Sequence, residues 1–161
     1  MVTIAGSCAV VASAQMNPAP VVTLKVSTLS VAAGKPIQAV LTVKFADGLH
    51  GYQNPPSDPS LIPVSVKSGD KAFSVVTINY PKGTPTKVGG MDKPVNLYQG
   101  TIQIPVILKA PTKLGKASLK LTFSYQQCNE SACFPPGSVS VDGSVTVVKK
   151  VSTGKPAKGK A

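Results

Sequence analysis

KASLKLTFSYQQCNESACFPPGSVSVDGSVTVV, residues 116–148, contains the clearest structural signal of the chain. Before and after a break containing Pro and Gly, apolar residues alternate with small polar ones, as in Leu119, Leu121 and Phe123. Such alternation is typical of a strand with one buried face. The stretch therefore predicts strands at 116–126 and 138–148, joined by a turn that carries two cysteines.

The same strand-forming residues recur toward the N-terminus. Runs rich in Val, Ile, Leu and Thr, separated by segments containing Gly or Pro, predict further strands at 21–31, 36–46, 62–67, 73–80 and 97–108. No segment has a sustained helical period. About seven short strands at this spacing predict an all-β, immunoglobulin-like antiparallel β-sandwich. The chain has no Trp and no cysteine pair bridging distant strands, so the predicted likeness to immunoglobulins is one of architecture only.

Two connections of the predicted sandwich are unusually long, residues 47–61 and 81–96. Long loops in a compact domain are often functional, although rigid proline-rich spacers are the ordinary alternative. The first loop contains His50 and Tyr52, and the second contains Met91.

The ends of the 161-residue chain differ in composition from the middle. Residues 1–14 are small and apolar and end in Ala12-Ser13-Ala14, which predicts a signal peptide that lacks its charged start. A plain N-terminal strand and lipidation at Cys8 are the alternatives. We expect residues 15–148 to form the folded domain, residues 149–161 to be a disordered lysine-rich tail, and the protein to be periplasmic or secreted.

The net charge of +11 comes from lysine alone, because the chain contains no arginine. Nucleic-acid-binding proteins usually combine such charge with arginine and stacking aromatic residues, so we expect no nucleic-acid partner. The acid-free tail carries Lys149, Lys150, Lys155, Lys158 and Lys160. Contact of this tail with an anionic membrane surface stays open beside the simpler function of keeping the protein in solution.

Cleavage after Ala14 would leave two of the three cysteines, Cys128 and Cys133, an even number that favours a disulfide in an oxidising compartment. If their turn closes a hairpin, the Cα atoms lie roughly 4.5–5.5 Å apart, close enough for a disulfide. Spacing alone favours a structural bridge over a redox function, although a ring of about six residues stabilises a fold by only ~2 kcal/mol. A closed zinc site needs four ligands, and the chain adds only His50, so we expect no metal and no cofactor besides the disulfide itself.

The cysteine turn carries a family resemblance. The string Tyr125-Gln-Gln-Cys-Asn-Glu-Ser-Ala-Cys-Phe-Pro-Pro136 resembles that of the N-terminal periplasmic domain of DsbD-type thiol–disulfide interchange proteins. Gly48–Pro55, and Leu97–Gly100 leading into Ile104–Val106, support the resemblance, which covers roughly residues 20–148.

The resemblance implies an immunoglobulin-like thiol–disulfide oxidoreductase of the protein-disulfide reductase type. Cys128 and Cys133 would be the redox pair, with Cys133, beside Phe134 and Pro135, forming the mixed disulfide with a partner. The donor would be a thioredoxin-like protein or a membrane electron conduit. The acceptor would be a periplasmic disulfide isomerase or a cytochrome-maturation protein. A non-catalytic binding or adaptor domain with a structural hairpin disulfide is the alternative.

The resemblance also implies a cap loop over the redox pair, and residues 81–96 occupy its place. Met91 stands where the family carries an aromatic cap residue, and Gly89 and Gly90 replace acidic residues often found just before it. By analogy, Tyr52 and Tyr98 would line the pair, with His50 close by. A full DsbD-type protein continues into a membrane conduit and a thioredoxin-like domain, so we expect this chain to be a stand-alone version or a fragment.

Overall fold

The computed structural model describes residues 18–149, which form an all-β fold without a helix. Eleven strands follow one another along this part of the chain. They are β1 (Val21–Val26), β2 (Ser30–Ala32), β3 (Pro36–Lys44), β4 (His50–Tyr52), β5 (Ser65–Ser68), β6 (Ser74–Ile78), β7 (Thr84–Thr86), β8 (Val95–Gln99), β9 (Thr101–Lys109), β10 (Gly115–Tyr125) and β11 (Gly137–Val148).

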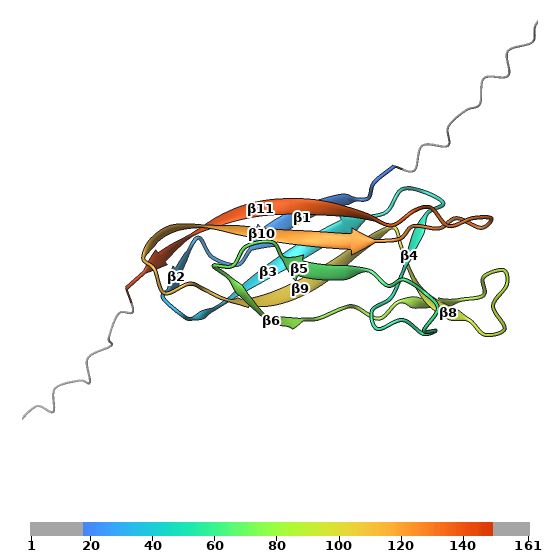
Figure 1. Cartoon of the computed structure of the whole chain (residues 1–161), viewed down its shortest axis with the longest axis horizontal. Helices are drawn as coiled ribbons and strands as arrows, with labels where there is room; N and C mark the ends of the chain where they lie inside the picture. Colours follow the sequence, from blue (N-terminus) through green and yellow to red (C-terminus); the bar gives the residue numbers. More distant parts are fainter. Residues whose placement is uncertain (1–17, 150–161) are drawn as a thin grey trace, which may run out of the picture.

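Two four-stranded sheets pack face to face along the long axis of the molecule (Figure 1). One has the order β1-β3-β9-β6 and the other β2-β11-β10-β5. The pairs are antiparallel except for β11 with β2, which is parallel. The predicted immunoglobulin-like sandwich is therefore confirmed.

The core between these sheets follows from the alternation read in the sequence. Leu119, Leu121 and Phe123 of β10 are completely buried, and Lys120 between them is exposed. The inward residues of β3 and β9 face them from the other sheet, with Leu41 and Ile104 also completely buried. Each such side chain stabilises the fold by about 1.5–3 kcal/mol through removal of apolar surface from water.

A third sheet, with the order β4-β8-β7, lies at one end of the sandwich (Figure 1). It separates from the main sheets at Gly100, whose φ of 62° is the left-handed conformation that glycine adopts easily. The single strand predicted at 97–108 is therefore two strands, β8 and β9, and the one predicted at 21–31 is likewise divided into β1 and β2. The sequence did not predict β4 and β7, which have three residues each.

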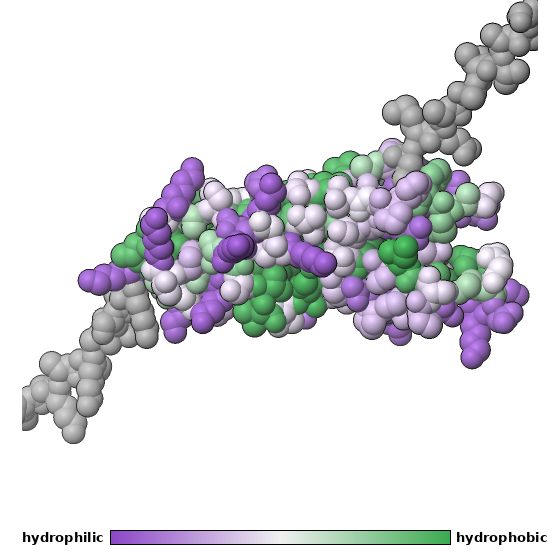
Figure 2. All heavy atoms as spheres, in the orientation of Figure 1, coloured by the Kyte–Doolittle hydropathy of each residue, from purple (hydrophilic) through white to green (hydrophobic). Residues whose placement is uncertain are grey.

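The turn between β10 and β11, which carries the cysteines, projects at this same end (Figure 1). On the side of the sandwich, β6 is an edge strand with exposed Val75 and Val76, and Figure 2 shows apolar surface over it. The predicted signal peptide at 1–14 and the predicted tail beyond Lys149 lie outside the described residues. Among residues 18–149, no helix has the length and apolar character that crossing a bilayer requires.

Candidate functional site

Cys128 and Cys133 form a disulfide at the start of the turn between β10 and β11. Two backbone hydrogen bonds enclose the pair: Asn129 N–H donates to the Ala132 carbonyl at 2.9 Å, and Phe134 N–H donates to the Gln127 carbonyl at 2.8 Å. The cysteines are thus a directly opposed antiparallel pair without hydrogen bonds of its own, the kind in which strands approach most closely. Their Cα atoms lie 4.0 Å apart, slightly less than the sequence predicted.

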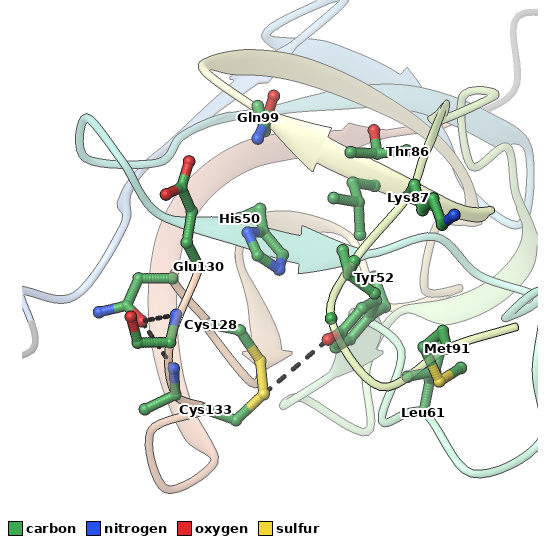
Figure 3. Close-up of a pocket in the computed structure, with 16 residues that line it drawn as sticks. His50, Tyr52, Leu61, Thr86, Lys87, Met91, Gln99, Cys128, Glu130 and Cys133 are labelled. Carbon is green, nitrogen blue, oxygen red and sulfur yellow. Dashed lines mark hydrogen bonds between the residues drawn. A yellow bond between two sulfur atoms is a disulfide. The ribbon is translucent and has the colours of Figure 1, made fainter. Parts of the chain in front are cut away.

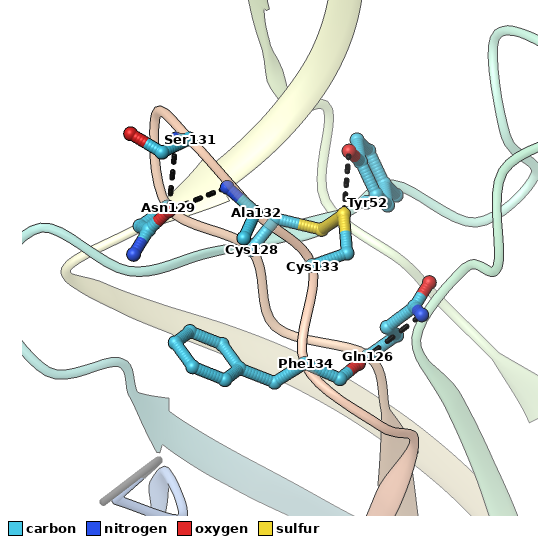
Figure 4. The surroundings of a disulfide bond; sticks show 8 residues. All are labelled: Tyr52, Gln126, Cys128, Asn129, Ser131, Ala132, Cys133 and Phe134. Atoms are coloured by element: carbon cyan, nitrogen blue, oxygen red, sulfur yellow. Dashed lines mark hydrogen bonds between the residues drawn. A yellow bond between two sulfur atoms is a disulfide. The ribbon is translucent and has the colours of Figure 1, made fainter. Parts of the chain in front are cut away.

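The four residues between the cysteines form a turn held by a side chain. Asn129 Oδ1 accepts hydrogen bonds from the backbone N–H groups of Ser131 and Ala132, both at 2.8 Å (Figure 4). Beyond the pair, Gln126 Nε2 donates to the Phe134 carbonyl at 3.2 Å. These contacts are independent of the S–S bond, so the backbone itself holds the two sulfurs opposite each other.

The two cysteines differ in their access to solvent. Cys128 is 1% exposed and packs in an apolar cluster with Tyr52, Val95 and Leu97. Cys133 is exposed. A thiol from another molecule can therefore approach Cys133 Sγ, whereas the protein itself shields Cys128 Sγ. This asymmetry was not visible in the spacing of the two residues.

Strand β4 runs beside the buried cysteine. His50 and Cys128 exchange both backbone N–H···O=C hydrogen bonds, each at 3.0 Å. Directly opposed residues project their side chains to the same face of a sheet, with Cβ atoms about 4.5–5.5 Å apart. On the other side of β4, His50 is paired with Gln99 of β8. Gln99, His50, Cys128 and Cys133 consequently form one row of neighbouring side chains across four chain segments.

Tyr52 lies two residues after His50 and therefore projects from the same face of β4. Its hydroxyl is 3.8 Å from Cys133 Sγ, and its ring meets the His50 ring edge to face at a centroid distance of 5.7 Å (Figure 3). Gly51, between the two, faces the sandwich, where a Cβ atom would lie 3.0 Å from Phe45 and 3.1 Å from Val64. The missing side chain lets β4 pack closely against the core while its other face forms the site.

A cavity of about 520 Å³ opens over this face of β4 (Figure 3). We call residues 87–91, which directly follow β7, the cap segment, and all of them except Gly90 line the cavity. Val88 and Met91 of this segment pack against the cluster around Cys128. The lining residues are His50, Tyr52, Leu61, Thr86, Lys87, Val88, Gly89, Met91, Leu97, Gln99, Cys128, Asn129, Glu130, Ser131, Ala132 and Cys133.

Burial shifts two titrating groups of the cavity in opposite senses. It lowers the pKa of His50 from the ordinary value of 6.5, because desolvation disfavours the imidazolium. It raises the pKa of Tyr52, because desolvation disfavours the phenolate. At neutral pH the cavity therefore presents a neutral imidazole and a neutral hydroxyl beside the disulfide.

The structure brings together only some of the residues that the sequence proposed for the site. His50, Tyr52 and Met91 line the cavity with both cysteines. Tyr98 does not: it is 2% exposed within the sandwich core, and its hydroxyl donates to the Pro81 carbonyl at 2.6 Å. The alternation of β8 explains this correction, because Leu97 and Gln99 take the cavity face and Tyr98 the opposite one.

Phe134 and Pro135 also lie outside the cavity lining. In Figure 4 the Phe134 ring points away from the disulfide, and its backbone groups bind Gln126 and Gln127. Leu97 and Gln99 line the cavity but were not predicted as site residues, although a correct assignment of β8 and its alternation would have indicated them. Within residues 18–149, no group of three or more His, Cys, Asp or Glu residues is arranged to hold a metal ion.

Comparison with known families gives a match that covers most of the described domain. The family model described as "Thiol:disulfide interchange protein DsbD, N-terminal" matches residues 18–144. The comparison with curated protein sequences finds no match.

Among solved structures, the N-terminal periplasmic domain of ScsB from Proteus mirabilis is similar, with a TM-score of 0.56 and 15% sequence identity. The match covers 75% of this chain and 44% of the ScsB chain, so this chain spans less than half of that structure. The reduced N-terminal domain of Neisseria meningitidis DsbD also matches, with a TM-score of 0.44, 20% identity, and coverage of 71% of this chain and 81% of that one.

Proposed function

The chain belongs to the family of DsbD N-terminal domains, and from this premise we propose that it transfers electrons between proteins by dithiol–disulfide exchange at Cys128 and Cys133. The observation that carries the proposal is the unequal exposure of the pair: Cys133 is exposed at the cavity, and Cys128 is buried. Exchange requires a thiolate to reach one sulfur while the other leaves. Because only Cys133 Sγ is accessible, the geometry determines that this sulfur is attacked and that Cys128 Sγ leaves.

Reduction of the domain would proceed in two steps. A donor thiolate attacks Cys133 Sγ, the Cys128–Cys133 bond breaks, and Cys128 leaves with the bonding electron pair as a thiolate. The second thiol of the donor, once deprotonated, then attacks its own sulfur in the mixed disulfide and releases Cys133. Two electrons and two protons have passed to the domain, which delivers them to an acceptor disulfide by the reverse sequence.

Tyr52 assists the exposed sulfur in this scheme. Its hydroxyl lies 3.8 Å from Cys133 Sγ, and burial raises the pKa of Tyr52, so the hydroxyl keeps its proton at neutral pH. A neutral hydroxyl donates a hydrogen bond to a thiolate and stabilises it. We assign Tyr52 the stabilisation of Cys133 when that sulfur is released from a mixed disulfide.

The cap segment limits access without closing the site. Met91 and Val88 pack against the cluster around Cys128. Gly89 and Gly90 are exposed and have no side chain that could obstruct a partner protein. Among the described residues, this arrangement leaves Cys133 accessible beside a cavity of about 520 Å³. We assign the cap segment to shielding Cys128 rather than to covering the whole pair.

The proposed partners follow from the chemistry and the family. A dithiol donor, either a thioredoxin-like protein or a membrane electron conduit, would reduce the domain. A periplasmic disulfide isomerase or a cytochrome-maturation protein would accept the electrons. We therefore propose that the domain acts in the periplasm as a thiol–disulfide oxidoreductase of the protein-disulfide reductase type.

Trapping with a thioredoxin-like protein tests the order of attack. Cys128→Ala should accumulate a mixed disulfide through Cys133, because no second sulfur is present to displace the partner. Cys133→Ala should form no such adduct, because Cys128 is buried. If both variants form the adduct equally, or if neither does, the proposed exchange is wrong.

The reduction potential separates exchange from the alternative of a binding domain with a structural bridge. A value near about −200 mV suits exchange with cellular dithiols, whereas a value below about −300 mV suits an inert bridge. Equilibration of the folded domain with glutathione buffers, followed by alkylation and mass measurement, gives this value. An inert potential would leave only the binding domain.

A further inference from the structure

His50 lies beside the reacting disulfide but has no part in the two exchange steps. It is the neighbour of the buried cysteine in the row Gln99–His50–Cys128–Cys133, held there by two backbone hydrogen bonds of 3.0 Å. Those bonds fix both the register and the face of the sheet. The imidazole and Cys128 Sγ therefore project side by side toward the cavity that both residues line (Figure 3).

One ring nitrogen of His50 is buried without a hydrogen-bond partner among the described residues. His50 is only 6% exposed, and its Nε2 atom has no hydrogen-bond partner among the residues that the structure describes. Buried polar atoms are nearly always paired, so an unpaired one next to a reactive group calls for an explanation. In the disulfide form, Cys128 has no S–H to offer this nitrogen. Reduction creates one.

Cys128 needs a proton carrier for the exchange. A buried thiol resists ionisation, yet it must become a thiolate to attack Cys133 Sγ and displace an acceptor. In the opposite direction it leaves as a thiolate in an apolar cluster, where an unpaired charge is costly. Both directions need a group beside Cys128 Sγ that exchanges one proton.

We propose that His50 is the acid–base residue of Cys128: its imidazole takes the proton from this thiol when the sulfur attacks, and returns it when the sulfur leaves. The inference rests on the proposed function. To the proposed exchange it adds the group that carries the proton to and from the buried Cys128 sulfur.

Reduction of an acceptor reaches a mixed disulfide between Cys133 and the acceptor, with Cys128 still a thiol. Neutral His50 removes the proton from Cys128, the thiolate attacks Cys133 Sγ, the Cys128–Cys133 bond forms, and the acceptor leaves as a thiolate with the electron pair. Imidazolium His50 then releases its proton to water in the cavity. When the domain is reduced, His50 takes up a proton from water in the cavity as negative charge develops on Cys128 Sγ. The imidazolium then passes this proton to the departing Cys128 thiolate and returns to the neutral form.

Burial, rather than neighbouring charge, favours a His50 that is neutral at rest. The other titratable groups lining the cavity besides the cysteines are Tyr52 on the same strand, Glu130 from the cysteine turn and Lys87 from the cap segment. Glu130 and Lys87 are both exposed and of opposite sign. Burial lowers the pKa of His50, which leaves a free base for the Cys128 proton at neutral pH.

Reaction of the reduced protein with dithiobis(nitrobenzoate) isolates the proposed step. Cys133 attacks the reagent and releases a first coloured thiolate, and Cys128 then resolves the mixed disulfide and releases a second. The second phase is the step in which His50 acts. His50→Gln should slow it by about 10²-fold, the usual contribution of a general base, and change the first phase little.

The pH profile and chemical rescue distinguish proton transfer from support of the fold. The second phase of the wild type should show an inflection from His50, the sole histidine of the chain, and His50→Gln should lose that inflection. Imidazole added to His50→Ala should restore much of the rate, because the cavity opens to this position. Gln103→Ala, at an exposed position of β9 outside the cavity lining, is the control and should resolve at the wild-type rate.

The outcomes separate the two proposals. If the wild type releases both thiolates and His50→Gln does so within about twofold of its rate and with the same pH profile, the assignment of His50 is overturned and the exchange function stands. If the wild type releases only the first thiolate, Cys128 does not resolve the mixed disulfide, and the proposed exchange itself fails.

Discussion

The sandwich and the cavity end of this molecule use the same secondary structure for opposite purposes. In the sandwich, long strands such as β10 bury one apolar side chain after another, with Leu119, Leu121 and Phe123 fully enclosed. At the cavity end, strands of three to five residues hold polar side chains around open space. Stability and chemistry therefore reside in different parts of one chain.

Strands β8 and β4 connect these regions, because one face of each strand packs against the sandwich core and the other face lines the cavity. On β8, Tyr98 packs into the sandwich core while Leu97 and Gln99 line the cavity. On β4, Gly51 faces Phe45 in the core, and the residues on either side of it face the cavity. A change on the core side of these strands should affect both regions, whereas a change in the centre of the sandwich should affect stability alone.

Phe123→Ala should have the largest effect on stability. Phe123 is fully buried and stacks with Tyr125 at a centroid distance of 5.9 Å, so its truncation should lower the free energy of unfolding by about 3–5 kcal/mol. The rate of disulfide exchange of the folded fraction should stay unchanged. Urea denaturation and thiol-exchange kinetics measure the two quantities. Val76→Ala, at an exposed position of β6, is the control and should change stability by less than about 0.5 kcal/mol.

Gly51→Ala should cost less stability but affect both regions. The new methyl group would meet Phe45 at 3.0 Å and Val64 at 3.1 Å, and overpacking of this kind typically costs about 1–3 kcal/mol. Because β4 must move away from the core, the His50–Cys128 pairing should loosen and the exchange rate should change. Gly89→Ala is the matched control, since a Cβ there has no neighbour within 4 Å. Equal stability of the two variants would contradict the close packing of β4 at Gly51 against Phe45 and Val64 of the core.

The smallest effect should be a loss of stability in mild acid. Burial lowers the pKa of His50 from 6.5, so below that pH the unfolded chain binds a proton that the folded protein does not yet accept. Stability should therefore be constant above pH 6.5 with respect to this group and decrease as the pH falls from 6.5 toward the lowered value. Denaturation at a series of pH values checks this, and His50→Gln should remove the dependence in that window. Retention of the full dependence in the variant would assign it to other groups.

The sandwich was largely readable from the sequence because local alternation determines which face of a long strand is buried. The strands at 116–126 and 138–148 were predicted to within one residue of β10 and β11. The failures fall where strands are short or interrupted. β4 consists of His50, Gly51 and Tyr52, β7 has Pro85 at its centre, and three residues are too few to show a period.

The cavity was predictable only as far as the cysteines and the motif around them. Two of its features depend on pairing between distant segments, which a sequence pattern does not contain. The first is the register that places His50 against Cys128, and the second is the face of β8 that turns Tyr98 away from the site. The unequal burial of the two cysteines has the same origin, because Val95 and Leu97, which cover Cys128, lie more than 30 residues away in the chain.

The cysteine turn is closed by its own backbone hydrogen bonds and by Asn129, and these do not involve the sulfurs. Breaking the S–S bond opens a ring spanning only five positions and leaves that scaffold in place. The oxidised and reduced forms of the domain would then present nearly the same surface to a partner protein. A donor and an acceptor would therefore compete for the same binding surface. The direction of electron transfer would be set by their concentrations and relative reduction potentials, not by a conformational change of the domain.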